Sequence, residues 1–189
     1  MTSTLPTSLD LTKSIKFAQL SAAVRSGNVT RVLAYLSNKN CQTRDPLADQ
    51  GYPDEDGYNT TVVNSLLYEA VPHFEVLKIL LEDGRFDPND NNKDAFYRCL
   101  LAGNIQGLKL FYDQPNFTFP DDTLTKVAEL GGRQVIKFLL HLDELSDYSL
   151  FSQDDKVNAL DKARESHDQL ITTMLQENID IAYRPAFGL

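Results

Sequence analysis

The chain has little cysteine and no excess of basic residues, and each shortage excludes a class of protein. Its 189 residues include two cysteines, Cys41 and Cys99, too few for a disulfide framework or a cysteine-rich metal site. Lys and Arg number 18 against 27 Asp and Glu, which gives a formal net charge of −9. Because nucleic acids and anionic membrane surfaces attract basic proteins, we expect neither as a partner of this acidic chain.

Long apolar runs and targeting signals are also missing. No stretch approaches the roughly 18 apolar residues that a membrane-spanning helix needs. Residues 1–14 contain no basic region followed by an apolar core, so they do not form a secretory signal. We therefore expect a cytoplasmic protein. A protein delivered into a host cytoplasm without a cleaved signal peptide would have the same features.

Sets of residues that could perform catalysis are not evident. The three histidines share no metal-ligand spacing, and the acidic residues cluster in turns rather than along one helix face. We predict no catalytic residue, no bound metal, no cofactor and no small-molecule substrate, so the chain is not expected to be an enzyme. A small enzyme built on a helical scaffold is the less favoured alternative.

The stretch from Pro72 to Leu101 predicts two helices joined by a turn. An apolar stripe at helical spacing begins at Phe74, and Gly84 is placed to end that helix. Pro88 forbids helix in the connection, and a second helical pattern starts near Asp94. One such pair cannot bury its apolar stripes alone, so further copies are expected along the chain.

Four further copies are present when the small residue between paired helices is used as a reference. These turn residues are Gly27, Pro72, Gly103, Gly131 and Ser166. The ninth residue after each is large, in order Leu36, Leu81, Tyr112, Leu140 and Leu175. The residue directly after each turn residue is predicted to cap the following helix, in order Asn28, His73, Asn104, Gly132 and His167. Five copies in register predict an array of helical hairpins.

The copies resemble the ankyrin repeat. The resemblance rests on AAVRSGNVTRVLAYL, AVPHFEVLKILLEDG, CLLAGNIQGLKLFY and VAELGGRQVIKFLL, and most weakly on KARESHDQLITTML. The run LLEDGRFDPNDNNKDAF resembles ankyrin repeats whose hairpin is trimmed to a turn, whereas the Thr-Pro-Leu-His start of a typical ankyrin repeat is absent from every copy. The resemblance implies an all-α, ankyrin-like solenoid of about four to five repeats with short or absent hairpins.

These patterns divide the chain into segments. We expect a mobile N-terminal segment over 1–14, a repeat domain over 15–176 and a C-terminal tail over 177–189. An insertion loop over 37–61 interrupts the repeats, with Pro and Gly and no helical period. The fifth helix pair is the most polar, which suits a cap at the end of a solenoid.

The ankyrin resemblance implies a protein–protein interaction module, such as an adaptor, scaffold or inhibitor, that contacts another protein through its concave face and loop tips. The candidate contact residues are Arg25, Ser26, Leu101, Glu129 and Leu130 at the turns, with Asp54, Glu55, Asp56 and Tyr58 in the insertion loop. The acidic loop would suit a partner with a basic patch, or it is only a solvated insertion. A bacterial or viral effector that binds a host protein is the alternative function.

Leu101 and Leu130 are apolar at positions expected to face solvent in adjacent repeats. We expect them to form an apolar contact patch with a charged rim. The alternative is that one of the two leucines packs beneath a trimmed hairpin.

Overall fold

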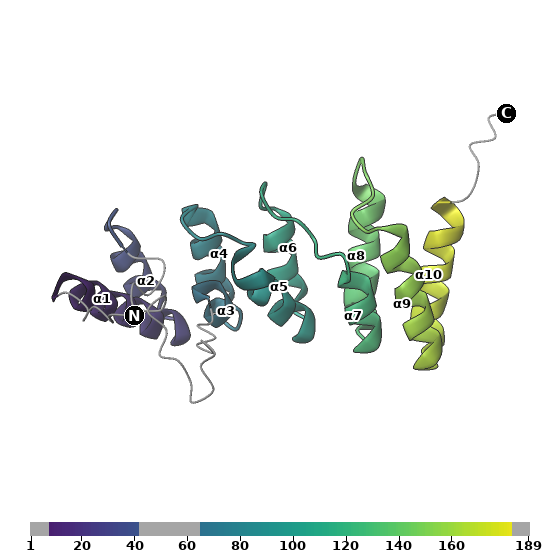
Figure 1. The fold of residues 1–189 in the computed structure, drawn as a ribbon, viewed down its shortest axis with the longest axis horizontal. Coiled ribbons are helices and arrows are strands. Elements are labelled where there is room, and N and C mark those ends of the chain that lie inside the picture. The colour runs from purple at the N-terminus through teal and green to yellow at the C-terminus, as the bar shows by residue number, and fades with distance from the viewer. Residues whose placement is uncertain (1–7, 42–64, 183–189) are drawn as a thin grey trace, which may run out of the picture. The chain divides into compact units, whose positions relative to one another are not determined.

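The computed structural model describes residues 8–41 and 65–182 (Figure 1). Ten helices lie in these ranges and no strand does, which confirms the predicted all-α class. The helices are α1 (Ser8–Arg25), α2 (Val29–Leu36), α3 (Leu66–Ala70), α4 (Phe74–Asp83), α5 (Asp90–Leu101), α6 (Ile105–Tyr112), α7 (Thr123–Glu129), α8 (Arg133–Leu145), α9 (Gln153–Glu165) and α10 (Gln169–Ala182). None of the helices in the described ranges has both the length and the apolar character needed to cross a membrane.

Helical structure extends further toward both ends than the sequence predicts. α1 begins at Ser8, inside the segment 1–14 that was expected to be mobile, because no Pro or Gly interrupts the chain from there to the end of the helix. α10 continues to Ala182, inside the predicted tail 177–189, because the buried stripe of Ile171 and Leu175 continues to Ile179. Most of the insertion loop, with Asp54, Glu55, Asp56 and Tyr58, lies outside the described residues.

The turns inside four of the five helix pairs share one backbone geometry. The middle residue of each three-residue turn has a positive φ: 65° at Gly27, 62° at Gly103, 66° at Gly131 and 58° at His167. Its N–H donates to the carbonyl three residues back, and the next N–H donates to the carbonyl five residues back. This hydrogen-bond pattern satisfies the last carbonyls of the first helix. The prediction of Ser166 as the fifth turn residue is therefore wrong by one position.

Asn28, His73 and Gly132 hold the predicted N-cap positions, whereas the prediction of His167 as a cap is wrong. Asn28 Oδ1 accepts the Arg31 N–H at 3.0 Å, as expected for a cap. Asp168 caps α10 in place of His167, because its Oδ1 accepts the N–H groups of Leu170 and Ile171 at 3.1 Å. His73 makes no side-chain cap for α4; its Nε2 instead lies 2.9 Å from the carbonyl oxygen of Arg25 in the preceding turn.

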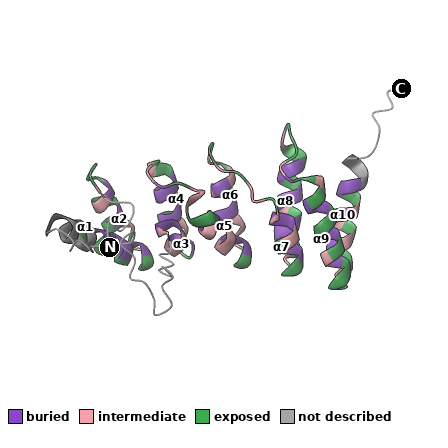
Figure 2. Ribbon diagram, viewed as in Figure 1, coloured by how far each residue is buried: buried purple, intermediate pink, exposed green. Residues whose placement is uncertain are grey.

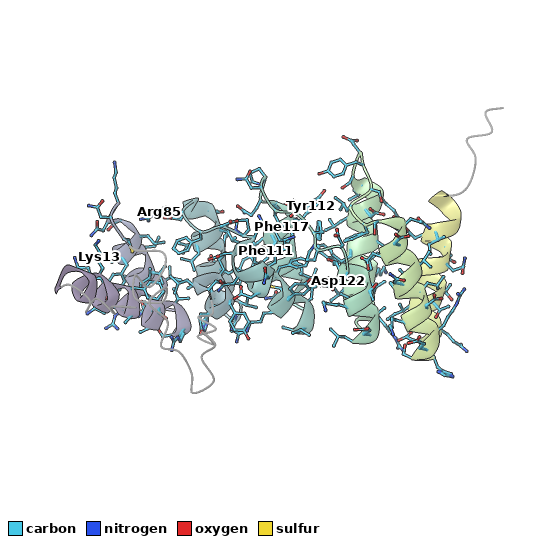
Figure 3. The ribbon with its side chains drawn as sticks, in the orientation of Figure 1. Lys13, Arg85, Phe111, Tyr112, Phe117 and Asp122 are labelled. Carbon is cyan, nitrogen blue, oxygen red and sulfur yellow. The ribbon has the colours of Figure 1, made fainter. Side chains whose placement is uncertain are left out.

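The chain divides into two compact units. The first comprises the described residues up to Arg98 together with Gln106–Phe117. Its core is apolar, with Leu20, Leu77 and Phe96 fully buried. Phe117, after α6, packs on this core with its ring centroid 5.4 Å from that of Phe111 (Figure 3).

Polar contacts join successive helix pairs inside the first unit. The Arg85 guanidinium donates to the carbonyls of Leu36 at 2.7 Å and Asn38 at 3.1 Å, and it is paired with Asp83 (Figure 3). The Asp94 carboxylate of α5 accepts the hydroxyl of Ser65 at 2.8 Å, and Ser65 itself caps α3. Each contact connects residues far apart in the sequence, so both fix the packing of one pair on the next.

The second unit comprises Cys99–Ile105 and the described residues from Thr118 onward. In this unit α7 lies beside α8, and α9 lies beside α10 (Figure 1). Leu124, Ile136 and Leu139 are fully buried between them. The carboxylate of Asp155, in the first turn of α9, accepts the N–H groups of Leu124 at 2.9 Å and Thr125 at 3.0 Å. A residue of one helix pair thus caps the first helix of the preceding pair.

Candidate interaction surface

The two leucines predicted at the turns are both exposed. Leu101 ends α5 with 68% of its surface exposed, and Leu130 directly follows α7 with 54% exposed. Exposed residues, green in Figure 2, gather at the turn that follows α7. The alternative in which one of these leucines packs beneath a hairpin is therefore wrong. Both side chains are accessible to a partner.

Charged residues lie close in sequence to Leu130 in the second unit. Arg133 Nε donates to Asp168 Oδ2 at 2.9 Å, which ties the start of α8 to the cap of α10. This contact lowers the pKa of the Asp168 carboxyl. Leu170, two residues after Asp168, is 52% exposed, so a second leucine lies close in sequence to the same ion pair. Exposed leucines and an ion pair therefore occur at these turns, and the apolar contact patch with a charged rim stays a prediction.

Glu129 is a further charged residue at these turns. It is exposed, and it lies close enough to Lys162 of α9 to interact with it electrostatically. Lys162 Nζ is 2.9 Å from Glu165 Oε2, and these two carboxylates, Glu165 first, raise the pKa of the lysine. The predicted contact residue Glu129, the last residue of α7, therefore lies near the Lys162–Glu165 ion pair of α9.

Arg25 and Ser26 occupy the first turn, in the first unit. The Arg25 side chain is 63% exposed; it donates to the Ser21 hydroxyl at 3.0 Å and lies 3.7 Å from Glu69. The Ser26 hydroxyl donates to the carbonyl of Ala23 at 3.0 Å and so completes the turn. Because exposed ion pairs are weak, the guanidinium can leave Glu69 for a partner at little cost.

Sequence reasoning missed two exposed apolar side chains at the other end of α8. Leu145 is 67% exposed and Tyr148 is 73% exposed. Further along the same connection Phe151 is buried, whereas Leu150 is half-buried. The signal that could have found this site is the run of acidic residues around Leu145 and Tyr148, which leaves them without the apolar neighbours of a core.

Two carboxyl groups with shifted pKa values, Asp83 and Asp155, take part in contacts that join helices. Asp155 is 2% exposed; burial raises the pKa of its carboxyl, and the hydrogen bonds from Thr125 and Leu124 oppose that rise. The hydrogen bond from Arg85 lowers the pKa of Asp83. Burial raises the pKa of the Cys41 thiol. The carboxylates of Asp83 and Asp155 thus serve as a helix-pair contact and a helix cap.

A cleft of about 220 Å³ lies in the first unit beside α3. It is lined by Ser65, Leu66, Leu67, Arg85, Phe86, Asp87 and Asp90. Its charged groups already have partners: Arg85 binds Asp83 and two carbonyls, and Asp87 accepts the N–H of Asn89 at 2.9 Å. The cleft therefore contains structural hydrogen bonds rather than a nucleophile beside a base.

Comparison with known proteins found no matching family model, curated protein or solved structure. Among the described residues, no group of three His, Cys, Asp or Glu side chains is arranged to hold a metal ion. The function is therefore inferred from the chain's own exposed residues and their surroundings.

Proposed function

We propose that the chain is a non-enzymatic protein-interaction module, built from ankyrin-like helical repeats, that binds a partner protein through its within-pair turns. The repeat interpretation is supported by the backbone geometry that recurs at Gly27, Gly103, Gly131 and His167. A left-handed residue followed by a short cap restarts the chain in the opposite direction each time. Because these turns share one backbone geometry, the residues next to them occupy equivalent positions in successive pairs.

The observation that carries the proposal is the exposure of Leu101 and Leu130. A single exposed leucine needs no explanation, but these two occupy the carboxyl-terminal ends of the first helices in consecutive pairs. Interfaces in which a few side chains dominate the binding energy place them in a desolvated centre, surrounded by a polar rim. Glu129 and Arg133, which are close in sequence to Leu130, and Asp168, which pairs with Arg133, would supply such a rim.

We call Leu101, Leu130 and the charged residues beside them at the within-pair turns the turn surface. Binding at this surface predicts which substitutions abolish the interaction. Leu101→Asp with Leu130→Asp puts two charges into an interface centre, where an unpaired charge is costly to desolvate. Leu33→Asp is the matched control, because Leu33 lies within α2, away from a turn, and is 50% exposed, close to the value for Leu130. All three substitutions are at exposed positions, so the fold should survive them, which circular dichroism and a thermal melt would check.

The test is affinity purification with the wild-type chain, the double variant and the Leu33→Asp control, followed by mass spectrometry. We expect proteins captured by the wild type and the control to be absent from the double variant. Calorimetric titration of the captured protein should then show a loss of about thirtyfold or more in affinity. A folded double variant that binds this protein with wild-type affinity would overturn the proposal for the turn surface.

A further inference from the structure

The connection between α8 and α9 presents two apolar side chains to solvent. Leu145, the last residue of α8, is 67% exposed, and Tyr148 is 73% exposed. We call residues 144–148 the acidic tip. α8 begins at the within-pair turn and ends at the tip, so its 13 residues separate the two sites by about 18 Å. The acidic tip is therefore distinct from the turn surface around Leu130.

The acidic tip is held in place by a buried carboxylate. The Asp143 and Lys156 side chains are each 6% exposed, and Lys156 Nζ lies 2.5 Å from Asp143 Oδ2. The N–H of Leu150 donates to Asp143 Oδ1 at 2.6 Å. One carboxylate therefore binds both Lys156 of α9 and the backbone of the connection between α8 and α9. A buried, fully bonded group of this kind fixes the backbone on either side of it.

A second anchor lies at the end of the same connection. Phe151 is 3% exposed, and its ring centroid is 5.1 Å from that of Phe119. The Ser149 hydroxyl lies 2.8 Å from the Phe151 carbonyl oxygen and 3.3 Å from Asp143 Oδ1. With both ends of the connection fixed, little conformational entropy remains to be lost at Leu145 and Tyr148 when a partner binds them.

The charge around these two side chains is of one sign. From 142 to 155 the sequence contains five acidic residues and no Lys or Arg. Asp143 is neutralised by Lys156, and Asp155 is buried as the cap of α7, which leaves Glu144, Asp147 and Asp154 exposed. The tip therefore combines an exposed leucine and tyrosine with carboxylates on neighbouring residues.

We propose that the acidic tip is a second contact surface, which binds a basic segment of a partner protein, one in which Lys or Arg residues flank aliphatic or aromatic side chains. The inference rests on the proposed interaction function and assigns a partner chemistry to a separate site. Tyrosine is enriched among residues that dominate binding energy, and the carboxylates would attract and orient the basic residues. A second copy of this acidic chain and an anionic membrane would both be repelled by the same carboxylates.

The test is selection of a phage-displayed random peptide library on the folded wild-type chain. We expect the enriched peptides to combine Lys or Arg with aliphatic or aromatic residues. Fluorescence anisotropy should show that Leu145→Ser with Tyr148→Ser weakens their binding about tenfold or more, whereas Leu33→Ser does not. Glu144→Gln with Asp147→Asn, which keeps the shape of the tip, should weaken binding at low salt more than at high salt.

Several results would overturn the inference. These are failure to enrich any peptide, enrichment of peptides without basic residues, and basic peptides that bind the Leu145→Ser/Tyr148→Ser variant as tightly as the wild type. Self-association of the wild type that the same variant abolishes would assign the tip to a second copy instead. Peptides selected at the tip should bind the Leu101→Asp/Leu130→Asp variant normally, so failure of the tip is distinguishable from failure of the turn surface.

Discussion

The turns within helix pairs and the connections between pairs are fixed by different kinds of contact. At Gly27, Gly103, Gly131 and His167 the conformation is set locally, by one left-handed residue and hydrogen bonds to carbonyls three and five residues back. The connections are set by contacts between residues distant in sequence. Arg85 donates to the carbonyls of Leu36, which ends α2, and Asn38, and Lys156 pairs with Asp143.

This difference separates the two candidate contact surfaces. The turn surface is displayed by a backbone motif that needs only a residue tolerant of positive φ. The acidic tip is displayed by a connection whose geometry depends on a buried ion pair. Substitutions should therefore be costly at the supports of the connection and mild at the turns.

The largest effect is expected from Lys156→Met. It leaves the Asp143 carboxylate buried without its cation, which should lower the free energy of unfolding by about 3–5 kcal/mol in chemical denaturation. The matched control is Lys126→Met, because Lys126 pairs with Asp122 on the surface with 45% of its side chain exposed and should be nearly neutral. Equal, small losses for both lysines would show that the buried pair does not hold the connection.

At the turns, Gly131→Ala should cost about 1–2 kcal/mol, because nothing lies within 4 Å of the added Cβ and only the positive φ is unfavourable. Gly27→Ala should cost more, since its Cβ would stand 2.5 Å from Nδ1 of His73. Urea denaturation would compare the two.

The His73→Ala background separates strain from collision at Gly27. In that background the loss of stability caused by Gly27→Ala should fall to the loss measured for Gly131→Ala, because the imidazole ring that the added Cβ would meet is gone. An unchanged cost in that background would contradict the close packing of His73 on the turn.

The helical class and most turn positions could be predicted from the sequence because their signals are local. Three of the five predicted turn residues are left-handed glycines, and Pro72 also lies in a turn. The fifth turn was placed one residue early because its left-handed residue is a histidine, and no glycine marks it. The exposure of Leu101 and Leu130 was predictable from their places outside the apolar stripe.

The acidic run around Leu145 and Tyr148 is visible in the sequence, but the fixed geometry of the acidic tip could not be predicted because its supports are tertiary contacts. Nothing in the local sequence pairs Asp143 with Lys156, or places Phe119 against Phe151. The cap that Asp155 of α9 provides for α7 also joins residues far apart in the sequence, since the two helices belong to different pairs. A carboxylate that caps a distant helix has the same local pattern as a solvated acidic residue.

A gain of stability, smaller in size than the losses expected from Gly131→Ala and Gly27→Ala, is expected from His167→Gly. Glycine adopts the φ of 58° without the penalty that a Cβ brings, so the variant should gain roughly 0.5–1 kcal/mol of stability. The loss of the contact between His167 Nδ1 and the Glu165 carbonyl will offset part of this gain. A thermal melt that falls, rather than rises, would contradict the left-handed assignment of the fifth turn.

The smallest expected effect is that the contributions of Asp155 and Asp168 to stability depend on pH in opposite directions. Burial raises the folded-state pKa of Asp155, so its ionised form is the less favourable one in the fold, and its contribution improves as the pH falls from neutral toward about 4. The hydrogen bond from Arg133 lowers the pKa of Asp168, so its contribution is present above about pH 4 and is lost below it.

Denaturation of the wild type, Asp155→Asn and Asp168→Asn over this pH range would measure both contributions. The wild type should gain stability relative to Asp155→Asn as the pH falls. It should lose stability relative to Asp168→Asn in the acidic part of the range. Differences that change in the same direction for both carboxylates would contradict the buried position of Asp155.

Partner binding at the within-pair turns is tested most directly by hydrogen–deuterium exchange of the chain with and without the captured protein. We predict slower exchange in the complex at residues 101–104 and 129–132, because an interface excludes water from the backbone there. A partner that recognises the acidic tip would also slow exchange at residues 144–148. A complex in which exchange at 101–104 and 129–132 is unchanged would contradict binding at the turn surface.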